Sequence, residues 1–346
     1  MKTPLPKISF IILTFNGGEL LRSCLKSIRS QDYPQELVEI VTVDDASSDN
    51  SVEISEDYGA KVYISGKRDM YLSWGIALHK ITGEYTYMVD QDIELRGKDF
   101  ITKMVKPMLE DKEISGSFTR AYPRSDQPWI TRFISYHPFQ CDPLYEYLTP
   151  PVEGTYLIEK EGYIKCDFQL GKIPAESRVM YRVNVLKKTP NWKMERIFDH
   201  DLLIKTIKEG FDKYAYVPSA GIFHHHAKNL KHLLNKRLRN IDMHYFPYQE
   251  ELEYKWLDTS SKKSVLRMVF WVIYANLFLP ATVRGFIRFL KHRDWALLME
   301  PIVTIATTDV IIWGFLTHSV GQELIRKSLK TLLNSKRIKA GGAFGR

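Results

Sequence analysis

The sequence predicts an α/β protein with a mostly parallel sheet, followed by a helical region. Three observations support this prediction: short apolar runs alternate with helical periodicity over the first hundred residues, acidic pairs follow two of those runs, and long apolar stretches occur only after residue 260. Strand–helix units with right-handed crossovers form a parallel sheet covered on both faces, and ligands bind at the carboxyl ends of its strands.

The first half of the sheet is marked by four apolar runs. Residues 8–15 predict a buried strand, and a turn at 16–18 leads into a helix whose apolar residues are spaced by three and four over 20–28. The remaining predicted elements of this part are a strand at 38–43, a helix from Asp49 or Asn50 to about 58, a strand at 60–64, a less regular helix at 71–81 and a strand at 85–89.

The second half of the chain is less regular at first. From 112 to about 190 the periodicity weakens, and we expect loops with some antiparallel strand. The pattern then predicts a helix at 201–209 that ends at Gly210, strands at 214–217 and 221–226, and a basic helix at 228–240.

The composition is that of a globular protein. The chain has 346 residues, 44% hydrophobic and 26% charged, which excludes fibrous, collagen-like and disordered proteins. The formal net charge of +8 suits an anionic partner: nucleic acid, a phosphorylated substrate or an acidic membrane surface. Cys24, Cys141 and Cys166 are odd in number and contain no CxxC pair, which argues against a disulfide framework and a zinc site and favours a reducing compartment.

Two acidic pairs follow predicted strands. Asp90 and Asp92 flank Gln91, and alternate residues of an extended chain point the same way, so both carboxylates can face one divalent cation; the alternative is a pair of loop-capping aspartates. Asp44 and Asp45 can accept hydrogen bonds from a base or ribose, or can cap the next helix. A G-x-G-x-x-G motif and a Walker lysine are both missing, which disfavours dinucleotide binding and P-loop hydrolysis.

These motifs together resemble family-2 inverting glycosyltransferases, which have the GT-A fold. The resemblance is carried by ISFIILTFN at 8–16, VDDASSD at 43–49 and the D-Q-D motif, and it extends over about 7–240 through GEY at 83–85, FDHDL at 198–202, Gly210, the histidines at 224–226 and KRLR at 236–239. It implies that Asp45 contacts the nucleotide base, with Phe15, Asn16, Asp44 and Asp90 also on the nucleotide-sugar side. It further implies that Asp90 and Asp92 hold Mg²⁺ or Mn²⁺ across the donor diphosphate.

The resemblance also assigns the catalytic base. Asp199 would deprotonate the acceptor, which then attacks the anomeric carbon from the face opposite the leaving group, and Asp201 is the second candidate. On the local sequence alone, Asp199 can equally be a helix N-cap.

Histidine and arginine candidates complete the predicted site. His224 and His226 lie on one face of the presumed strand and can reach the cation or the diphosphate, whereas His225 should point away; the alternative is an exposed polar strand end. Arg237 and Arg239 lie near the family's Q-x-x-R-W position, where an arginine contacts the donor phosphates; the alternative is a solvated helix face. Lys236 and Asn240 replace the glutamine and the tryptophan, which argues against a processive polymerase.

Two apolar stretches near the C-terminus suggest membrane association. Residues 268–283 would give a helix of about 24 Å, against a hydrocarbon core of about 30 Å. Residues 295–317 are longer but contain Glu300, Pro301 and Asp309. Every flank is basic, including the middle cluster of Arg284, Arg288, Lys291 and Arg293, so we expect interfacial or re-entrant helices at the cytoplasmic face of an anionic membrane. The alternative is a soluble helical subdomain.

The sequence thus predicts a GT-A catalytic domain at 1–245, a helical membrane-associated region at 246–335 and a disordered tail at 336–346. We expect a metal-dependent glycosyltransferase that moves a sugar from a UDP- or GDP-linked donor to a lipid-linked or polyprenyl-phosphate acceptor in cell-envelope glycan synthesis. The alternatives are a soluble or polysaccharide acceptor, a sugar-nucleotide pyrophosphorylase and a non-catalytic scaffold. Nucleic acid is not expected as a partner, because the basic residues cluster around the apolar tail without stacking aromatics.

Overall fold

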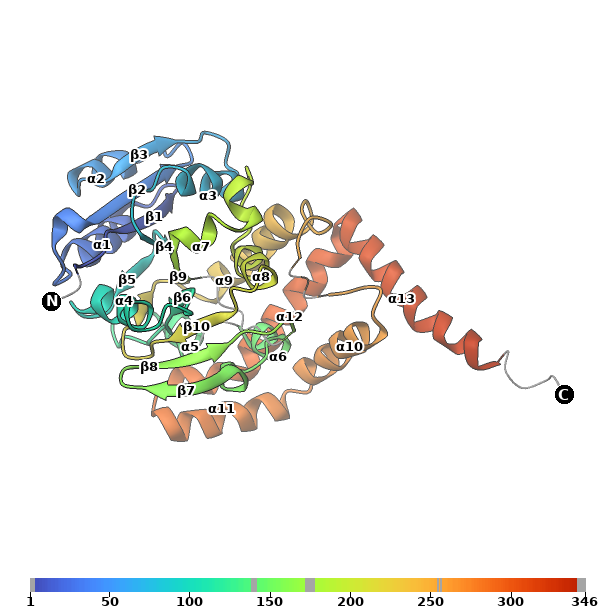
Figure 1. Ribbon diagram of the computed structural model, residues 1–346. Helices are drawn as coiled ribbons and strands as arrows, with labels where there is room; N and C mark the ends of the chain where they lie inside the picture. Colours follow the sequence, from blue (N-terminus) through green and yellow to red (C-terminus); the bar gives the residue numbers. More distant parts are fainter. Residues whose placement is uncertain (1–3, 138–141, 172–177, 254, 256, 341–346) are drawn as a thin grey trace. The chain divides into compact units, whose positions relative to one another are not determined.

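The computed structural model describes residues 4–137, 142–171, 178–253, 255 and 257–340 (Figure 1). Its contacts divide the chain into two compact units. The first unit consists of Met1–Gln127, Ser135–Gln140 and Thr149–His226. The second unit consists of Pro128–Ile134, Cys141–Leu148 and Ala227–Arg346. The main division between the units therefore lies after His226. The predicted ends of the catalytic domain at 245 and of the membrane-associated region at 335 stay predictions.

The first unit contains the predicted parallel sheet. Its first four strands are β1 (Ile8–Thr14), β2 (Val38–Asp44), β3 (Lys61–Ile64) and β4 (Tyr85–Asp90), which pair in the order β3-β2-β1-β4. All three pairings are parallel, as predicted. β1 and β2 are buried along almost their whole length, because a strand inside a parallel sheet is covered on both faces.

The helices between these strands cover both faces of the sheet. They are α1 (Gly18–Arg29), α2 (Ser51–Asp57) and α3 (Met70–Leu78), with a short helix η1 (Gln35–Leu37) before β2. The chain moves outward from β1 to β3 and then returns to β4, so right-handed crossovers put α1 and α2 on one face and α3 on the other. In agreement, α1 packs against α2, and α3 packs against β1 and β2.

The other half of the sheet is mixed. Beyond β4 the order continues through β9 (Val179–Arg182), β6 (Gly116–Phe118), β10 (Lys213–Tyr216), β8 (Tyr163–Asp167) and β7 (Tyr156–Lys160). β9 is antiparallel to both β4 and β6, so β4 and β6 point the same way and their carboxyl ends lie at one edge. The antiparallel pairs of β7, β8 and β9 confirm the antiparallel strand expected between 112 and 190.

The remaining elements of the first unit surround this sheet. They are β5 (Ile93–Leu95), α4 (Phe100–Glu110), η2 (Val152–Thr155), α7 (Val183–Leu186), η3 (Pro190–Lys193), α8 (Asp199–Lys208) and β11 (Ile222–His224). β5 and β11 form a separate two-stranded antiparallel sheet. Cys24 and Cys166 are buried free thiols, whereas Cys141 lies outside the described residues.

The second unit is helical. It contains α5 (Trp129–Ser135), α6 (Pro143–Leu148), α9 (Leu230–Asn240), η4 (Ile241–Tyr245), α10 (Lys262–Asn276), α11 (Leu279–His292), η5 (Trp295–Met299), α12 (Glu300–Thr317) and α13 (Ser319–Ala340). Its core includes Leu144, Ile241, Trp271 and Phe315. The helix α13 extends into the predicted tail, and residues 341–346 lie outside the described part of the chain.

The first apolar stretch does not form one helix, so that prediction was wrong. The chain breaks after Asn276, and α10 and α11 meet at a bend of 75°. Pro280 lies in the first turn of α11, where its missing N–H breaks no helical hydrogen bond. Among the described residues, Trp295–Thr317 is long and apolar enough to cross a membrane, and half of it is buried within the structure. The helices α10 and α11 would form a second span only if the two together were counted as one broken span.

Part of the basic cluster expected at the lipid surface is used inside the second unit. Glu300 is fully buried and forms ion pairs with Arg284 at 3.2 Å and Arg288 at 2.7 Å. Arg284 also pairs with Glu146 of α6. These two arginines therefore neutralise Glu300, and the attraction to anionic lipid that we expected of the whole cluster is left to Lys291 and Arg293.

Replacing Glu300 with alanine should destabilise the protein by about 3 kcal/mol, because it leaves two half-buried guanidinium groups without their shared carboxylate. The free energy of unfolding can be measured by urea titration. Glu323→Ala is the matched control, since Glu323 forms an exposed pair with Lys327 one turn away and should change stability little. Equal stability of both variants would show that the Glu300 pairs do not hold α11 against α12.

Candidate active site

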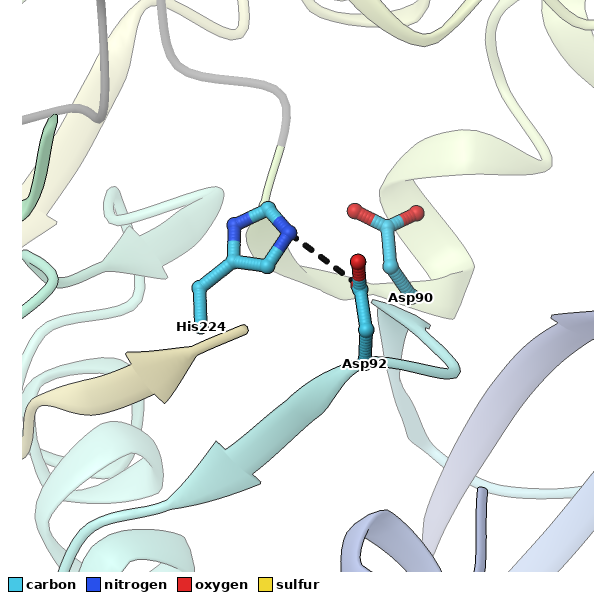
Figure 2. A group of neighbouring side chains, drawn as sticks. All are labelled: Asp90, Asp92 and His224. Carbon is cyan, nitrogen blue, oxygen red and sulfur yellow. Dashed lines mark ion pairs between the residues drawn. The ribbon is translucent and has the colours of Figure 1, made fainter. Parts of the chain in front are cut away.

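Three potential metal ligands converge at the carboxyl edge of the sheet (Figure 2). Asp90 ends β4, Asp92 immediately precedes β5, and His224 ends β11. The antiparallel pairing of β5 with β11 places His224 beside Ile93 and so brings it next to Asp92. One ligand atom from each of the three side chains lies within 4.8 Å of the others, and His224 Nε2 is 3.0 Å from Asp92 Oδ1.

The chemistry of this group suits a divalent cation. Metal–ligand bonds of about 2.1 Å would require only small side-chain shifts to bring all three atoms onto one ion. Mg²⁺ prefers oxygen ligands, whereas a mixed set of two carboxylates and one imidazole also accommodates Mn²⁺. The sequence alone had identified all three residues, but not their distance from one another.

The neighbouring histidines have different surroundings. The ring of His226 lies 5.0 Å from that of His224, but His226 is not one of the three residues whose ligand atoms converge. His225 Nε2 lies 2.6 Å from Glu94 Oε1. This hydrogen bond is the main reason that the pKa of Glu94 falls to about 2; Arg124 acts in the same direction, and partial burial opposes it. His225 therefore belongs to an ion-pair group beside the candidate metal site.

The middle residue of the D-Q-D motif joins two strand ends. Gln91 Oε1 accepts a hydrogen bond from Thr14 Oγ1 at 2.6 Å and from the backbone N–H of Phe15 at 3.0 Å. Gln91 thereby fixes the loop after β1 to the loop that carries Asp90 and Asp92. The sequence does not indicate a role for this side chain, because an amide between two aspartates belongs to no distinctive pattern.

The loops after β1 and β2 are also held together by side chains. Asn16 Oδ1 accepts a hydrogen bond from the backbone N–H of Ser48 at 2.8 Å, and the Asn16 N–H donates to Ser47 Oγ at 2.9 Å. Asp44 is 1% exposed and its carboxylate accepts from Ser47 N–H and Oγ. Asn16 and Asp44 thus shape the edge on which a nucleotide was predicted to bind.

On the predicted nucleotide side, Phe15 is exposed and Asp45 is half-buried. Asp45 Oδ1 accepts hydrogen bonds from Ser65 and, at 2.7 Å, from Ser73 of α3. The Phe15 ring is 39% exposed, and the guanidinium carbon of Arg68 lies 4.7 Å from its centre. The sequence pattern gave no indication of Ser73 or Arg68.

The predicted base lies in the first turn of α8, which begins two residues earlier than expected. Phe198 is the N-cap, so Asp199 is not the capping residue; its Oδ1 accepts from the His200 N–H at 2.9 Å. The Asp199 side chain is one-third exposed, whereas Asp201 is 1% exposed. An accessible carboxylate is the better placed of the two to meet an acceptor.

The segment before Asp199 packs against α3. The Ile197 N–H donates to the Tyr71 carbonyl at 2.9 Å, and the rings of Tyr71 and Phe198 are 4.4 Å apart. Gly75 makes this packing possible, because a Cβ there would lie 1.9 Å from the Glu195 carbonyl oxygen. One helix therefore contacts Asp45 through Ser73 and the Asp199 segment through Tyr71.

The predicted phosphate-binding arginines lie in the second unit. Arg237 and Arg239 are in the last turn of α9. Arg237 is 8% exposed, forms an ion pair with Asp142 at 2.6 Å, and stacks over the Tyr145 ring. Its contacts within the second unit account for its burial, and a donor-binding role for Arg237 and Arg239 stays a prediction.

Comparison with known proteins identifies the family to which this chain belongs. The model described as glycosyl transferase family 2 matches residues 9–188. The poly(ribitol-phosphate) β-N-acetylglucosaminyltransferase TarS of Staphylococcus aureus is 32% identical over 103 residues, which are 28% of this chain and 17% of TarS. The GalNAc(5)-diNAcBac-PP-undecaprenol β-1,3-glucosyltransferase of Campylobacter jejuni is 31% identical over 109 residues, which are 30% of this chain and 35% of that enzyme.

These matches span less than two thirds of either relative. Among solved structures, the mannosyltransferase PcManGT of Pyrobaculum calidifontis, in complex with GDP-Man and Mn²⁺, has a TM-score of 0.47 and 16% identity, covering 90% of this chain and 88% of that one.

Proposed function

Since the chain belongs to glycosyl transferase family 2, we propose that it is a metal-dependent inverting enzyme that uses a nucleotide-diphospho-sugar and a lipid-linked or polyprenyl-phosphate acceptor in cell-envelope glycan synthesis. UDP- and GDP-linked sugars are the proposed donors. The convergence of Asp90, Asp92 and His224 at the carboxyl edge of the sheet is the observation that supports this proposal most directly.

The residues of the first unit suit the parts of such a reaction. A divalent cation held by Asp90, Asp92 and His224 would supply positive charge to the donor diphosphate. Asp45 and Phe15 are accessible to a nucleoside, while Gln91 and Asn16 hold the loops that carry them. Asp199 accepts the proton of the acceptor oxygen as this oxygen bonds to the anomeric carbon and the sugar–diphosphate bond breaks.

The second unit supports a membrane-bound acceptor. Large apolar side chains are exposed along α10 and α11, among them Phe270, Ile273, Leu277, Phe278, Leu279, Val283, Phe286 and Ile287. Exposed apolar surface of this extent is typical of a site for another macromolecule or a membrane. Lys291 and Arg293, which follow on the same segment, favour an anionic leaflet, and we place the protein at the cytoplasmic face of the cell membrane.

A polymeric acceptor is the second candidate. TarS acts on poly(ribitol-phosphate), as its name states, whereas the Campylobacter relative acts on an undecaprenol-linked glycan. Both acceptors contain phosphate groups. The two candidates differ in whether the phosphate belongs to a lipid or to a soluble chain.

A donor screen tests the proposal. The purified protein should hydrolyse or transfer sugar from one class of UDP- or GDP-linked donor, and only with Mn²⁺ or Mg²⁺ present. NMR of the product should show an inverted anomeric configuration. Retention of configuration, or full activity in the presence of EDTA, would contradict the proposed mechanism, and the absence of nucleotide binding with any donor would contradict the proposed function as a whole.

A further inference from the structure

Two arginines stack against one tyrosine ring in the first unit. The guanidinium carbon of Arg96 is 4.5 Å from the centre of the Tyr122 ring, and that of Arg120 is 5.0 Å from it. The two cations therefore lie within about 10 Å of each other, close to the distance over which exposed charges interact at physiological salt.

The backbone fixes this arrangement. Tyr122 Oη donates a hydrogen bond to the Pro218 carbonyl at 2.7 Å, which sets the ring position. Gly221 has a φ of +74°, and a Cβ there would lie 2.7 Å from the ring and 3.0 Å from Arg96 Cδ. The Arg96 N–H donates to the Gly221 carbonyl at 3.1 Å. Three separate segments thus meet around one ring, and only glycine allows the approach.

Both guanidinium groups retain hydrogen-bonding capacity. Among the described residues, no carboxylate forms an ion pair with Arg96 or Arg120, and the side chain of Arg120 donates only to the Ala121 carbonyl, at 3.3 Å. The neighbouring Arg124 differs, because Glu94 and Asp126 both pair with it. Arg96 is exposed and Arg120 is half-buried, so an anion from solution can reach them.

Arg120 lies towards the carboxyl edge of the sheet, whereas Arg96 lies at the end of β5 that is farther from the candidate metal site. Arg120 follows β6, whose carboxyl end lies at the same edge as that of β4. Only β9 separates these strands, so the ends of β4 and β6 are about 10 Å apart at the usual strand spacing. Arg96 follows β5 four residues after Asp92, which is about 13 Å along an extended strand, so the pair would hold a phosphate that is separated from the reacting oxygen by other groups of the acceptor.

We propose that Arg96 and Arg120 bind a phosphate group of the acceptor, with Tyr122 holding the two guanidinium groups in place. This inference rests on the proposed glycosyltransferase function. Guanidinium groups bind phosphate oxygens through paired N–H donors, and two of them match the charge of a phosphate or diphosphate. The phosphate can come from a lipid diphosphate or from a phosphodiester chain, since both present the same oxygens.

Binding measurements with two probes test this site. Geranyl diphosphate represents the lipid source, and a ribitol-phosphate oligomer represents the polymer source. Arg96→Gln and Arg120→Gln should each weaken binding of the preferred probe at least about tenfold, as expected for loss of a hydrogen bond to a charged group. Arg96→Lys and Arg120→Lys keep the charge but lose the paired donors, and should show a smaller loss.

Controls separate this site from the donor site. Binding of UDP or GDP with Mn²⁺ should be unchanged in all four variants. Arg22→Gln is the matched control, because Arg22 pairs with Glu19 on α1 and should leave both bindings unchanged. If the variants lose affinity for only one of the two probes, that probe identifies the source of the phosphate.

The proposal would be overturned if both glutamine variants bound both probes with wild-type affinity. It would also be overturned if the variants lost nucleotide affinity as much as probe affinity, because the arginines would then belong to the donor site. If the wild-type protein bound the phosphate probes through these arginines but bound no nucleotide, the proposed function would fail while the phosphate site would stand.

Discussion

Asp199→Asn should lower kcat by at least about 100-fold and leave donor binding intact. Asparagine has the size of aspartate and keeps the oxygen that accepts the His200 N–H, so the first turn of α8 should be preserved. It cannot take a proton from the acceptor. Steady-state kinetics gives kcat, and calorimetry with UDP or GDP and Mn²⁺ gives donor affinity.

Asp201→Asn distinguishes the two candidate bases. Asp201 is buried in the same turn, so its replacement should affect the stability of α8 more than the chemical step. Asp57→Asn, at the exposed end of α2, controls for a general effect of removing a carboxylate. A fully active Asp199→Asn together with an inactive, folded Asp201→Asn would move the base two residues along the chain.

Asp92→Ala should abolish the dependence of nucleotide binding on Mn²⁺ and lower activity at least about 100-fold, since charge stabilisation by a metal is worth several kcal/mol. Two carboxylates and one imidazole hold a divalent cation weakly, so we expect productive metal binding only together with a nucleoside diphosphate. Calorimetry with and without Mn²⁺ measures this coupling, and Mn²⁺ electron paramagnetic resonance measures it independently of activity.

His224→Ala should weaken the coupling between Mn²⁺ binding and nucleotide binding, because the Nε2 atom of His224 lies beside Asp92. Asp99→Ala is the control, since Asp99 is an exposed aspartate at the start of α4 that pairs with Lys103. Identical nucleotide affinities with and without metal in the wild-type protein and in Asp92→Ala would remove the D-Q-D motif from the mechanism.

The strands of the parallel sheet could be predicted because each is buried on both faces and therefore reads as a continuous apolar run, as in 8–15 and 38–43. The helix α4 was not predicted: Pro107 lies inside it, and an internal proline normally argues against a helix. The break between α10 and α11 was also missed, because Asn276 and Pro280 lie in an otherwise unbroken apolar stretch.

The candidate site was predictable where a motif followed a strand. Asp90 and Asp92 belong to that class. The approach of His224 to Asp92 depends on two strands of three residues each, which are too short to give a periodic pattern and are separated by more than a hundred residues. The contacts of Gln91 and Ser73 depend on side-chain geometry, which no local pattern encodes.

The discontinuity of the second unit has a consequence for the order in which the protein can fold during synthesis. Residues 128–134 and 141–148 leave the ribosome long before the helices that cover them. Three ion pairs join these residues to later parts of the chain: Asp142 with Arg237, Glu146 with Arg284, and Arg132 with Asp294. A nascent chain therefore lacks these three ion pairs, and the helices that cover α5 and α6, until nearly 300 residues have been made. A fragment that ends at residue 245 keeps α5 and α6 without α10 to α13.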